Sequence, residues 1–175
     1  MARKAEGQAA LQNALEIEAE PLTNPVAEAL IAALNGEFSA LYPEPGANHF
    51  RLGPDEVAAG NGIFVVARWH GRPVGCGALR CIRDAVLMRE LGPRVGELKR
   101  MYVAADVRGR GIGRALLDRL EAEARTLGLA RLVLETGTRQ TEALALYRRA
   151  GFTEISAYGE YVASSATSVC LTKTL

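Results

Sequence analysis

Alternating apolar and acidic residues mark the first regular element of this sequence. Leu15, Ile17 and Ala19 alternate with three glutamates. This period of two is typical of a half-buried strand, and Pro21 is expected to end it.

A helix is expected next, because Asn24-Pro25 supplies a capping residue and a first-turn proline. Before Gly36, apolar residues recur on one helical face: Val26, Ala29, Leu30, Ala33 and Leu34. The following segment, Phe38 to Arg51, carries two prolines and a glycine among aromatic residues. That composition predicts an irregular segment, which could border a substrate cleft.

Two β-rich runs, Ile63 to Trp69 and Pro73 to Arg83, flank His70-Gly71-Arg72. This arrangement predicts a hairpin. Asp84 to Gly96 is expected to be an excursion from the sheet.

The rest of the chain predicts a β-α-β unit, then a helix and two strands. The expected elements are a strand at Glu97 to Val103, a helix at Gly111 to Leu127, a strand at Leu132 to Thr136, a helix at Arg139 to Ala150 ended by Gly151, and strands at Phe152 to Ala157 and Ser168 to Thr174. The complete order is β-α-β-β-β-α-β-α-β-β, which indicates a mixed α/β sheet.

Composition indicates a single globular domain. The chain has 175 residues, of which 49% are hydrophobic and 23% charged, a balance unlike that of disordered or membrane proteins. We expect the domain over residues 14–175, with residues 1–13 as a tail or frayed helix. The net charge of +1 gives no bulk attraction to nucleic acid or acidic lipid, so neither is expected as a partner.

The three cysteines, Cys76, Cys81 and Cys170, form no Cys-x-x-Cys pair. They therefore indicate neither a disulfide framework nor a metal site. No apolar run approaches the roughly 20 residues that cross a bilayer, and no apolar stretch follows the first residues. These features predict a cytoplasmic protein.

Charge is nevertheless uneven along the chain. Residues 1–50 hold two basic and seven acidic side chains, whereas residues 99–149 hold eleven basic and six acidic ones. An anionic ligand is therefore expected in the second stretch. It contains Arg108-Gly109-Arg110-Gly111-Ile112-Gly113 between a predicted strand and helix, where glycines and unpaired amides suit a phosphate. The alternative is an ordinary glycine-rich turn; the spacing fits neither a Walker A loop nor a dinucleotide-binding motif.

Three segments stand out together: Glu97-Leu-Lys-Arg-Met-Tyr-Val103, Arg108-x-x-Gly111-x-Gly113-x-Ala115, and Ala143-Leu-Ala-Leu-Tyr147 followed by Gly151-Phe152. In combination they resemble the GNAT family of N-acetyltransferases. The resemblance implies a mostly antiparallel central sheet of about seven strands, flanked by helices and splayed between strands 4 and 5. It also implies transfer of an acetyl group from acetyl-CoA to a primary amine in one ternary complex, without a metal.

The resemblance implies a CoA site along this splay. The pantetheine arm would follow the strand at Met101, Tyr102 and Val103, with the Met101 amide facing the thioester carbonyl. The diphosphate would meet the amides of Arg108, Gly109, Arg110, Gly111, Ile112, Gly113 and Arg114. Gln140 stands where the family commonly has asparagine, so its contact with the CoA arm depends on a longer side chain.

Glu97 and Tyr147 are the catalytic candidates. An amine of pKa about 10.4 is mostly protonated at pH 7, and removing its proton costs roughly 4.6 kcal/mol. Glu97 could accept this proton through water; alternatively it only pairs with Lys99 or Arg100 on the sheet surface. The resemblance implies that Tyr147 protonates the departing thiolate; the alternative is a core aromatic residue. Tyr147 would also contact CoA.

The acceptor side is less defined by the sequence. Residues predicted in or beside loops near the cleft are Tyr42, His49, Phe50, Glu135, Tyr158, Glu160 and Tyr161, of which we take Glu135, Tyr158 and Tyr161 as candidate acceptor ligands. We expect a small-molecule amine. A protein lysine or N-terminal amine, and a non-catalytic acyl-CoA sensor, remain alternatives. The resemblance also admits a homodimer.

Overall fold

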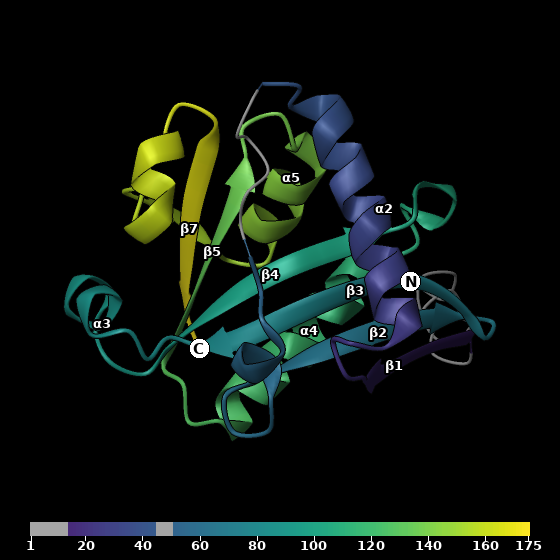
Figure 1. Ribbon diagram of the computed structural model, residues 1–175, viewed down its shortest axis with the longest axis horizontal. Helices are drawn as coiled ribbons and strands as arrows, with labels where there is room; N and C mark the ends of the chain where they lie inside the picture. Colours follow the sequence, from purple (N-terminus) through teal and green to yellow (C-terminus); the bar gives the residue numbers. More distant parts are fainter. Residues whose placement is uncertain (1–13, 45–50) are drawn as a thin grey trace, which may run out of the picture.

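A seven-stranded sheet in the order β1-β2-β3-β4-β5-β7-β6 runs through the centre of the molecule (Figure 1). The computed structural model describes residues 14–44 and 51–175. The strands are β1 (Leu15–Ala19), β2 (Gly62–Trp69), β3 (Arg72–Cys81), β4 (Val95–Val103), β5 (Arg131–Gly137), β6 (Thr153–Ile155) and β7 (Ser168–Thr174). β4 and β5 are parallel and all other neighbours are antiparallel, so the predicted mixed, mostly antiparallel sheet is confirmed.

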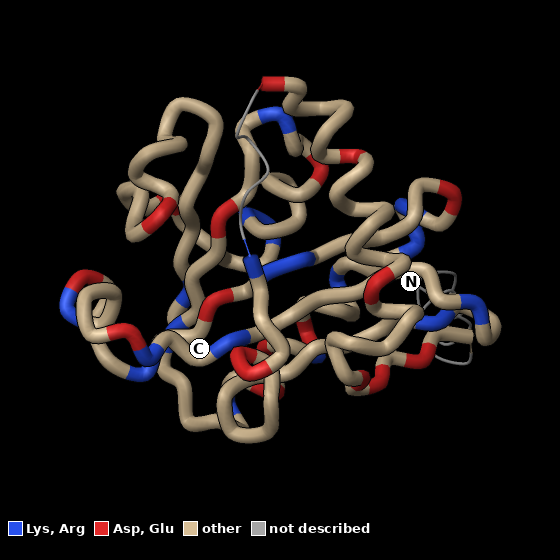
Figure 2. Tube along the Cα trace, viewed as in Figure 1, with Lys and Arg blue, Asp and Glu red and all other residues tan. Residues whose placement is uncertain are grey.

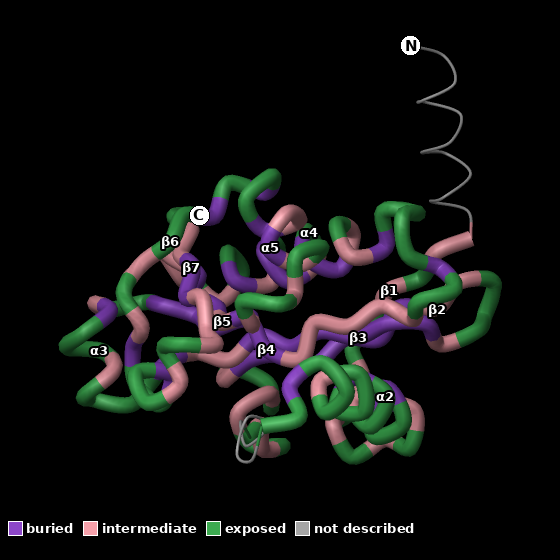
Figure 3. Tube along the Cα trace, turned by 90° about the horizontal axis from the view of Figure 1, so that it is seen from above, coloured by how far each residue is buried: buried purple, intermediate pink, exposed green. Residues whose placement is uncertain are grey.

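Helices cover both faces of this sheet (Figure 3). They are α2 (Pro25–Leu41), α3 (Ala85–Leu91), α4 (Ile112–Thr126) and α5 (Thr141–Arg149), with 3₁₀ turns η1 (Pro54–Val57), η2 (Ala105–Val107) and η3 (Gly159–Ser164). On one face, α4 and α5 pack on the largest apolar cluster, which includes Leu116, Leu120, Leu134 and Tyr147. On the other face, α2 packs on a smaller cluster around Phe64 and Cys76. No helix in the described ranges is long and apolar enough to cross a membrane.

The helix α2 begins as predicted but ends later. The Asn24 side chain accepts a hydrogen bond from the Val26 amide (2.9 Å), which caps the first turn. The prediction that the helix ends before Gly36 is wrong, because α2 continues to Leu41. A glycine inside a helix costs only about 1 kcal/mol, and the buried Leu34 and Tyr42 hold the segment on the sheet.

Other boundaries of helices and strands differ from the predicted ones for local reasons. The excursion at 84–96 contains α3, whose first turn is capped by the Asp84 carboxylate. The hairpin turn consists of His70 and Gly71 alone, both with positive φ, so Arg72 already belongs to β3. The predicted irregular segment is wrong over its first residues, which finish α2. Residues 1–13, His49 and Phe50 lie outside the described residues.

The two middle strands separate after a short parallel contact. β4 pairs with β5 only from Val95 to Leu98, although β4 continues to Val103. At this point β4 carries a bulge: Arg100 has φ +56°, and the register with β3 shifts opposite Gly77. A Cβ on Gly77 would lie 2.6 Å from Met101 Sδ, so the Met101 side chain packs directly over this glycine beside the bulge. The expected splay between strands 4 and 5 is confirmed.

Candidate active site

A cleft opens where β4 and β5 separate. Its volume is about 860 Å³, including the open solvent at its mouth. It is bordered by β4, β5, α5, the end of α2 and the segment from η3 to β7. The residues that line it are Leu34, Phe38, Tyr42, Leu98, Lys99, Arg100, Met101, Glu135, Thr136, Gly137, Gln140, Ala143, Tyr147, Tyr161, Ser164, Thr167 and Ser168.

Tyr147 lies at the inner wall of the cleft. Its ring is buried against Phe152, with ring centres 5.8 Å apart, and its hydroxyl makes no hydrogen bond to the described part of the chain. Burial raises the pKa of Tyr147, and the nearby Glu135 carboxylate raises it further. The phenol therefore stays protonated at neutral pH, and Tyr147 is one of the residues that line the cleft.

Gln140 shapes the turn between β5 and α5. Its side-chain oxygen accepts hydrogen bonds from the Thr136 hydroxyl (2.6 Å) and the Gly137 amide (3.0 Å). The longer side chain is thus folded back on the turn, and its amide group borders the cleft. The amide NH₂ has donors left for a ligand.

The outer edge of β4 is the second wall. β3 occupies one edge of β4, and within the described residues no strand pairs with the other edge beyond Leu98. Met101, Tyr102 and Val103 lie on this unpaired stretch, and Met101 lines the cleft. Backbone amides and carbonyls on a free edge can bind an extended ligand that carries amide groups.

The N-terminus of α4 follows this edge. Gly109 and Gly111 both have left-handed backbone angles, with φ +75° and +87°, and no side chain caps the helix. The first-turn amides, including those of Gly113 and Arg114, therefore lack intrahelical partners and favour an anion. Ile112, by contrast, is buried in the core.

Two of the three arginines around this turn form ion pairs within the protein. Arg108 pairs with Glu37 of α2 (2.6 Å) and donates to the Val103 carbonyl (2.9 Å). Arg114 pairs with Asp118 (2.8 Å), whereas Arg110 is exposed. The backbone is thus the main anion-binding feature.

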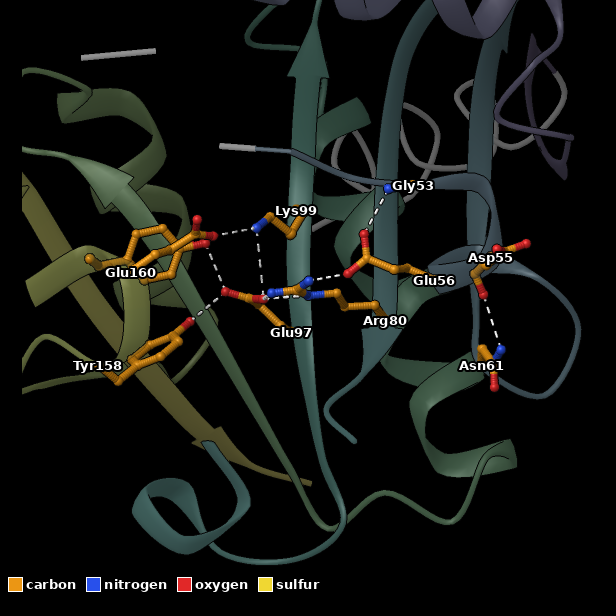
Figure 4. A network of polar contacts seen from close by, with 10 residues as sticks. Gly53, Asp55, Glu56, Asn61, Arg80, Glu97, Lys99, Tyr158 and Glu160 are labelled. Atoms are coloured by element: carbon orange, nitrogen blue, oxygen red, sulfur yellow. Dashed lines mark hydrogen bonds and ion pairs between the residues drawn. The ribbon is translucent and has the colours of Figure 1, made fainter. Parts of the chain in front are cut away.

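Glu97 is the centre of a buried ionic network (Figure 4). One carboxylate oxygen accepts hydrogen bonds from Tyr158 (2.9 Å) and Tyr161 (2.8 Å), and the other from Arg80 Nε (2.6 Å). The interpretation of Glu97 as a residue on the sheet surface is wrong, because its exposed fraction is 0%.

The network extends beyond Glu97 in both directions. Arg80 also pairs with Glu56, while Lys99 lies 3.9 Å from Glu97 and 3.2 Å from Glu160. Burial alone would lower the pKa of Arg80, but the Glu97 and Glu56 carboxylates raise it. No local pattern points to Arg80, which lies 17 residues before its main partner, Glu97.

The acceptor candidates divide between cleft and network. Glu135 and Tyr161 line the cleft, whereas Tyr158 is buried behind it against Glu97. Burial raises the pKa of Glu135, although a hydrogen bond with Ser168 and the Lys99 charge oppose this. Lys99 and Arg100, which the sequence analysis did not assign to a ligand, also line the cleft (Figure 2 shows the basic stretch of β4).

A contact between α2 and the β5–α5 turn closes one side of the cleft. The Tyr42 hydroxyl accepts a hydrogen bond from the Arg139 amide (2.7 Å), and the Arg139 guanidinium pairs with Glu44 (2.5 Å). A side chain on Gly137 would clash with the Tyr42 ring, so glycine is needed at this contact.

The cysteines offer no reactive thiol at the cleft. Burial raises the pKa of Cys76 to about 12 and that of Cys170 to about 11. Such thiols are poor nucleophiles at neutral pH. Within residues 14–44 and 51–175, no cluster of three His, Cys, Asp or Glu side chains could hold a metal ion.

Comparisons with known proteins agree with this geometry. A family model described as "Acetyltransferase (GNAT) family" matches residues 27–152. The chain is 40% identical to the IAA acetyltransferase of Azospirillum brasilense over 141 residues, which cover 81% of this chain and 85% of the relative.

Two solved structures share the fold. A Klebsiella pneumoniae protein assigned as an acyl-CoA N-acyltransferase superposes with a TM-score of 0.73 at 33% identity, covering 92% of this chain and 97% of that one. A GNAT family acetyltransferase from Elizabethkingia anophelis with acetyl-CoA bound gives 0.62 at 20% identity, covering 92% and 98%.

Proposed function

The chain belongs to the GNAT acetyltransferase family, and from this membership we propose that it transfers an acetyl group from acetyl-CoA directly to the primary amine of a small molecule. As a member it is an acyl-CoA-dependent N-acetyltransferase. The observation that carries the proposal is the cleft between β4 and β5, which is lined both by residues of a free strand edge and by Tyr147.

The CoA site uses backbone groups of β4 and of α4, the helix that follows it. The edge of β4 at Met101 to Val103 binds the pantetheine arm, and the first-turn amides of α4 bind the diphosphate. Gln140 donates to the arm from the opposite wall. Acetyl-CoA supplies the activated acetyl thioester, so this chain has only to orient the acceptor, stabilise charge and move protons.

Tyr147 acts at the leaving group. Its phenol donates a proton to the thiolate of CoA as the carbon–sulfur bond breaks. The raised pKa keeps the phenol protonated before the reaction. The buried thiols of Cys76 and Cys170 make an acetyl-cysteine route unfavourable, which leaves direct attack by the amine.

The walls of the cleft favour a small acceptor that also carries an acidic group. The contact of Tyr42 with Arg139 closes one side of the cleft, and Tyr161 and Ser164 of η3 line another. Lys99 is paired with Glu160 and lies near Glu97. Arg100 and Glu135, by contrast, line the cleft with opposite charges, so one small molecule that carries both an amine and a carboxylate suits this wall. The similarity to a protein named IAA acetyltransferase supports a small-molecule acceptor.

Calorimetric titration with acetyl-CoA, followed by a thiol-release assay over amines, tests this function. The panel pairs each amino acid with its carboxamide and its decarboxylated amine, and adds polyamines and lysine peptides. We expect binding, turnover, and a preference for the acid in each pair. Turnover on peptides alone would indicate a protein acetyltransferase, binding without turnover would indicate a sensor, and no binding would contradict the proposal.

A further inference from the structure

Glu97 of β4 and Glu135 of β5 lie on opposite sides of the point where these two strands separate. Glu97 lies opposite Val133, inside the short stretch where β4 and β5 are still paired. Glu135 lies beyond the last pair, Leu98 with Leu134, where the strands have separated. Only Glu135 is therefore on the wall of the cleft.

The Glu97 carboxylate is already fully engaged. Its two oxygens accept hydrogen bonds from two tyrosine hydroxyls and from Arg80. The positive charge of Lys99, 3.9 Å away, stabilises the same carboxylate. Its exposed fraction is 0%. A proton from an acceptor would have to displace one of these donors to reach it.

Glu135 has the opposite environment. It shares the cleft with Tyr147, and its charge acts on the Tyr147 phenol. The groups that face it are Ser168 of β7, which hydrogen-bonds it, Lys99 and Glu97 of β4, Glu160 and Tyr161 of η3, and Cys170. Burial and the two carboxylates raise the pKa of Glu135, which brings it closer to neutral pH and makes it a better proton acceptor.

We propose that Glu135 is the general base of the acetyl transfer and that Glu97 is a positioning residue. This assignment rests on the proposed function. The acceptor ammonium gives one proton to the Glu135 carboxylate, directly or through a water. The nitrogen lone pair then forms the bond to the thioester carbonyl carbon. As the carbon–sulfur bond breaks, the thiolate takes the Tyr147 proton. The second proton of the nitrogen then returns to the Tyr147 phenolate through water, and Glu135 releases its proton to solvent before the next turnover.

Glu97 acts through the tyrosines that it holds. Tyr161 lines the cleft, and its hydroxyl is fixed by Glu97 Oε1. Tyr158 is held by the same oxygen and packs edge-on against Tyr161, with ring centres 5.2 Å apart. Tyr158 directly precedes η3 and Tyr161 belongs to it. The buried Glu97 carboxylate therefore anchors η3 beside the acceptor site.

The test compares pH–rate profiles of Glu135→Gln and Glu97→Gln with the wild type. It uses acetyl-CoA and the best amine of the panel, and measures thiol release. Glu135→Gln should lower kcat at pH 7 by about 100-fold or more, the usual contribution of a general base. The loss should shrink as the pH approaches the pKa of the amine, because the free amine then needs no base. Glu135→Asp should retain the rising limb of the pH–rate profile, the range in which kcat increases with pH, but at a reduced rate.

Glu97→Gln should keep the rising limb of the wild type while KM for the acceptor rises. Tyr161→Phe should reproduce part of that rise, and serves in its place if Glu97→Gln does not fold. Glu121→Gln is the matched control, since Glu121 is a buried carboxylate of α4 paired with Lys173 (2.5 Å), outside the cleft. The Glu121→Gln variant should leave the rising limb of the pH–rate profile unchanged.

Stability gives a second readout. A carboxylate with a raised pKa in the folded state destabilises the fold as pH rises through that pKa. Glu135→Gln should therefore raise Tm relative to the wild type at pH 7, and the difference should fade towards pH 4.

Three results would overturn the assignment. The first is a pH–rate profile of Glu135→Gln with an unchanged rising limb. The second is a rise in KM of Glu135→Gln without loss of kcat. The third is loss of the rising limb in Glu97→Gln but not in Glu135→Gln. A wild type that binds acetyl-CoA but turns over no amine would remove the proposed function itself, and this assignment with it.

Discussion

Tyr147 belongs both to the apolar core and to the lining of the cleft. Its ring packs edge-on against the ring of Phe152. The Phe152 amide donates to the Tyr147 carbonyl (3.0 Å), so the end of α5 is fixed at the same residue. A change confined to the hydroxyl should therefore alter the reaction and leave the fold intact.

Tyr147→Phe should lower kcat by about 100-fold or more, the usual contribution of a general acid, and change the Kd of acetyl-CoA little. Thiol release and calorimetry measure the two quantities. Tyr42→Phe is the matched control, because it removes a hydroxyl from another tyrosine of the cleft. Wild-type turnover in Tyr147→Phe, or an equal loss of kcat in Tyr42→Phe, would contradict the role of Tyr147 as the acid.

At this scale the sequence predicted which residues lie at the cleft better than it predicted their partners. Tyr147 was selected as a catalytic candidate and Glu135 as a candidate acceptor ligand, and both line the cleft. The surroundings of Glu97 could not be predicted, because Tyr158 and Tyr161 lie 61 and 64 residues away. Such contacts depend on how η3 packs on β4, which local periodicity does not encode.

Among the elements, the N-terminus of α4 depends on backbone conformation more than on side chains. Gly111 occupies a left-handed conformation directly before the helix. An L-residue there costs roughly 1–2 kcal/mol and would shift the first-turn amides. Those amides are the ones that we propose bind the diphosphate.

Gly111→Ala should therefore weaken acetyl-CoA binding by about 10-fold, which corresponds to 1.4 kcal/mol. Calorimetry measures the change. Gly128→Ala is the control: it also has a positive φ (+71°) and open space around it, but follows the C-terminal end of α4. S-acetyl-pantetheine, which lacks the diphosphate, should react equally well with both variants, and an equal loss with this short thioester would exclude the diphosphate contact.

Element boundaries were predictable where the signal is local. β7 has the bounds that were predicted, and β1 begins at the predicted residue and ends just before Pro21, since alternation and flanking turns define both strands. The bulge at Arg100 was not predicted, because arginine carries no turn signal. It is held by tertiary packing, in which Met101 fills the space above Gly77.

For the whole molecule, the splay divides the sheet into two parts, β1 to β4 and β5 to β7. Between them, only four residue pairs form the parallel ladder from Val95 to Leu98. Side chains of α5 and the Tyr42 contact add to this junction. A ligand bound between β4 and α5 would contact both parts at once.

Acetyl-CoA should therefore stabilise the whole domain and not the CoA site alone. At a concentration of 100 Kd, a ligand that binds only the folded state adds about 2.7 kcal/mol to the free energy of unfolding. For a domain of this size, that corresponds to a rise in Tm of roughly 5–10 °C. Thermal unfolding with and without acetyl-CoA measures this shift, and Gly111→Ala should need more ligand for the same rise than Gly128→Ala.

Hydrogen exchange locates the stabilisation within the molecule. If the ligand joins the two parts of the sheet, amides of β4 and of β5 should both gain protection, because opening of the junction exposes both strands. Protection limited to the α4 turn, or an unchanged Tm at a saturating concentration, would contradict a ligand that bridges the splay. The same experiment with CoA should give a similar pattern, since the arm and the diphosphate, and not the acetyl group, span the two parts.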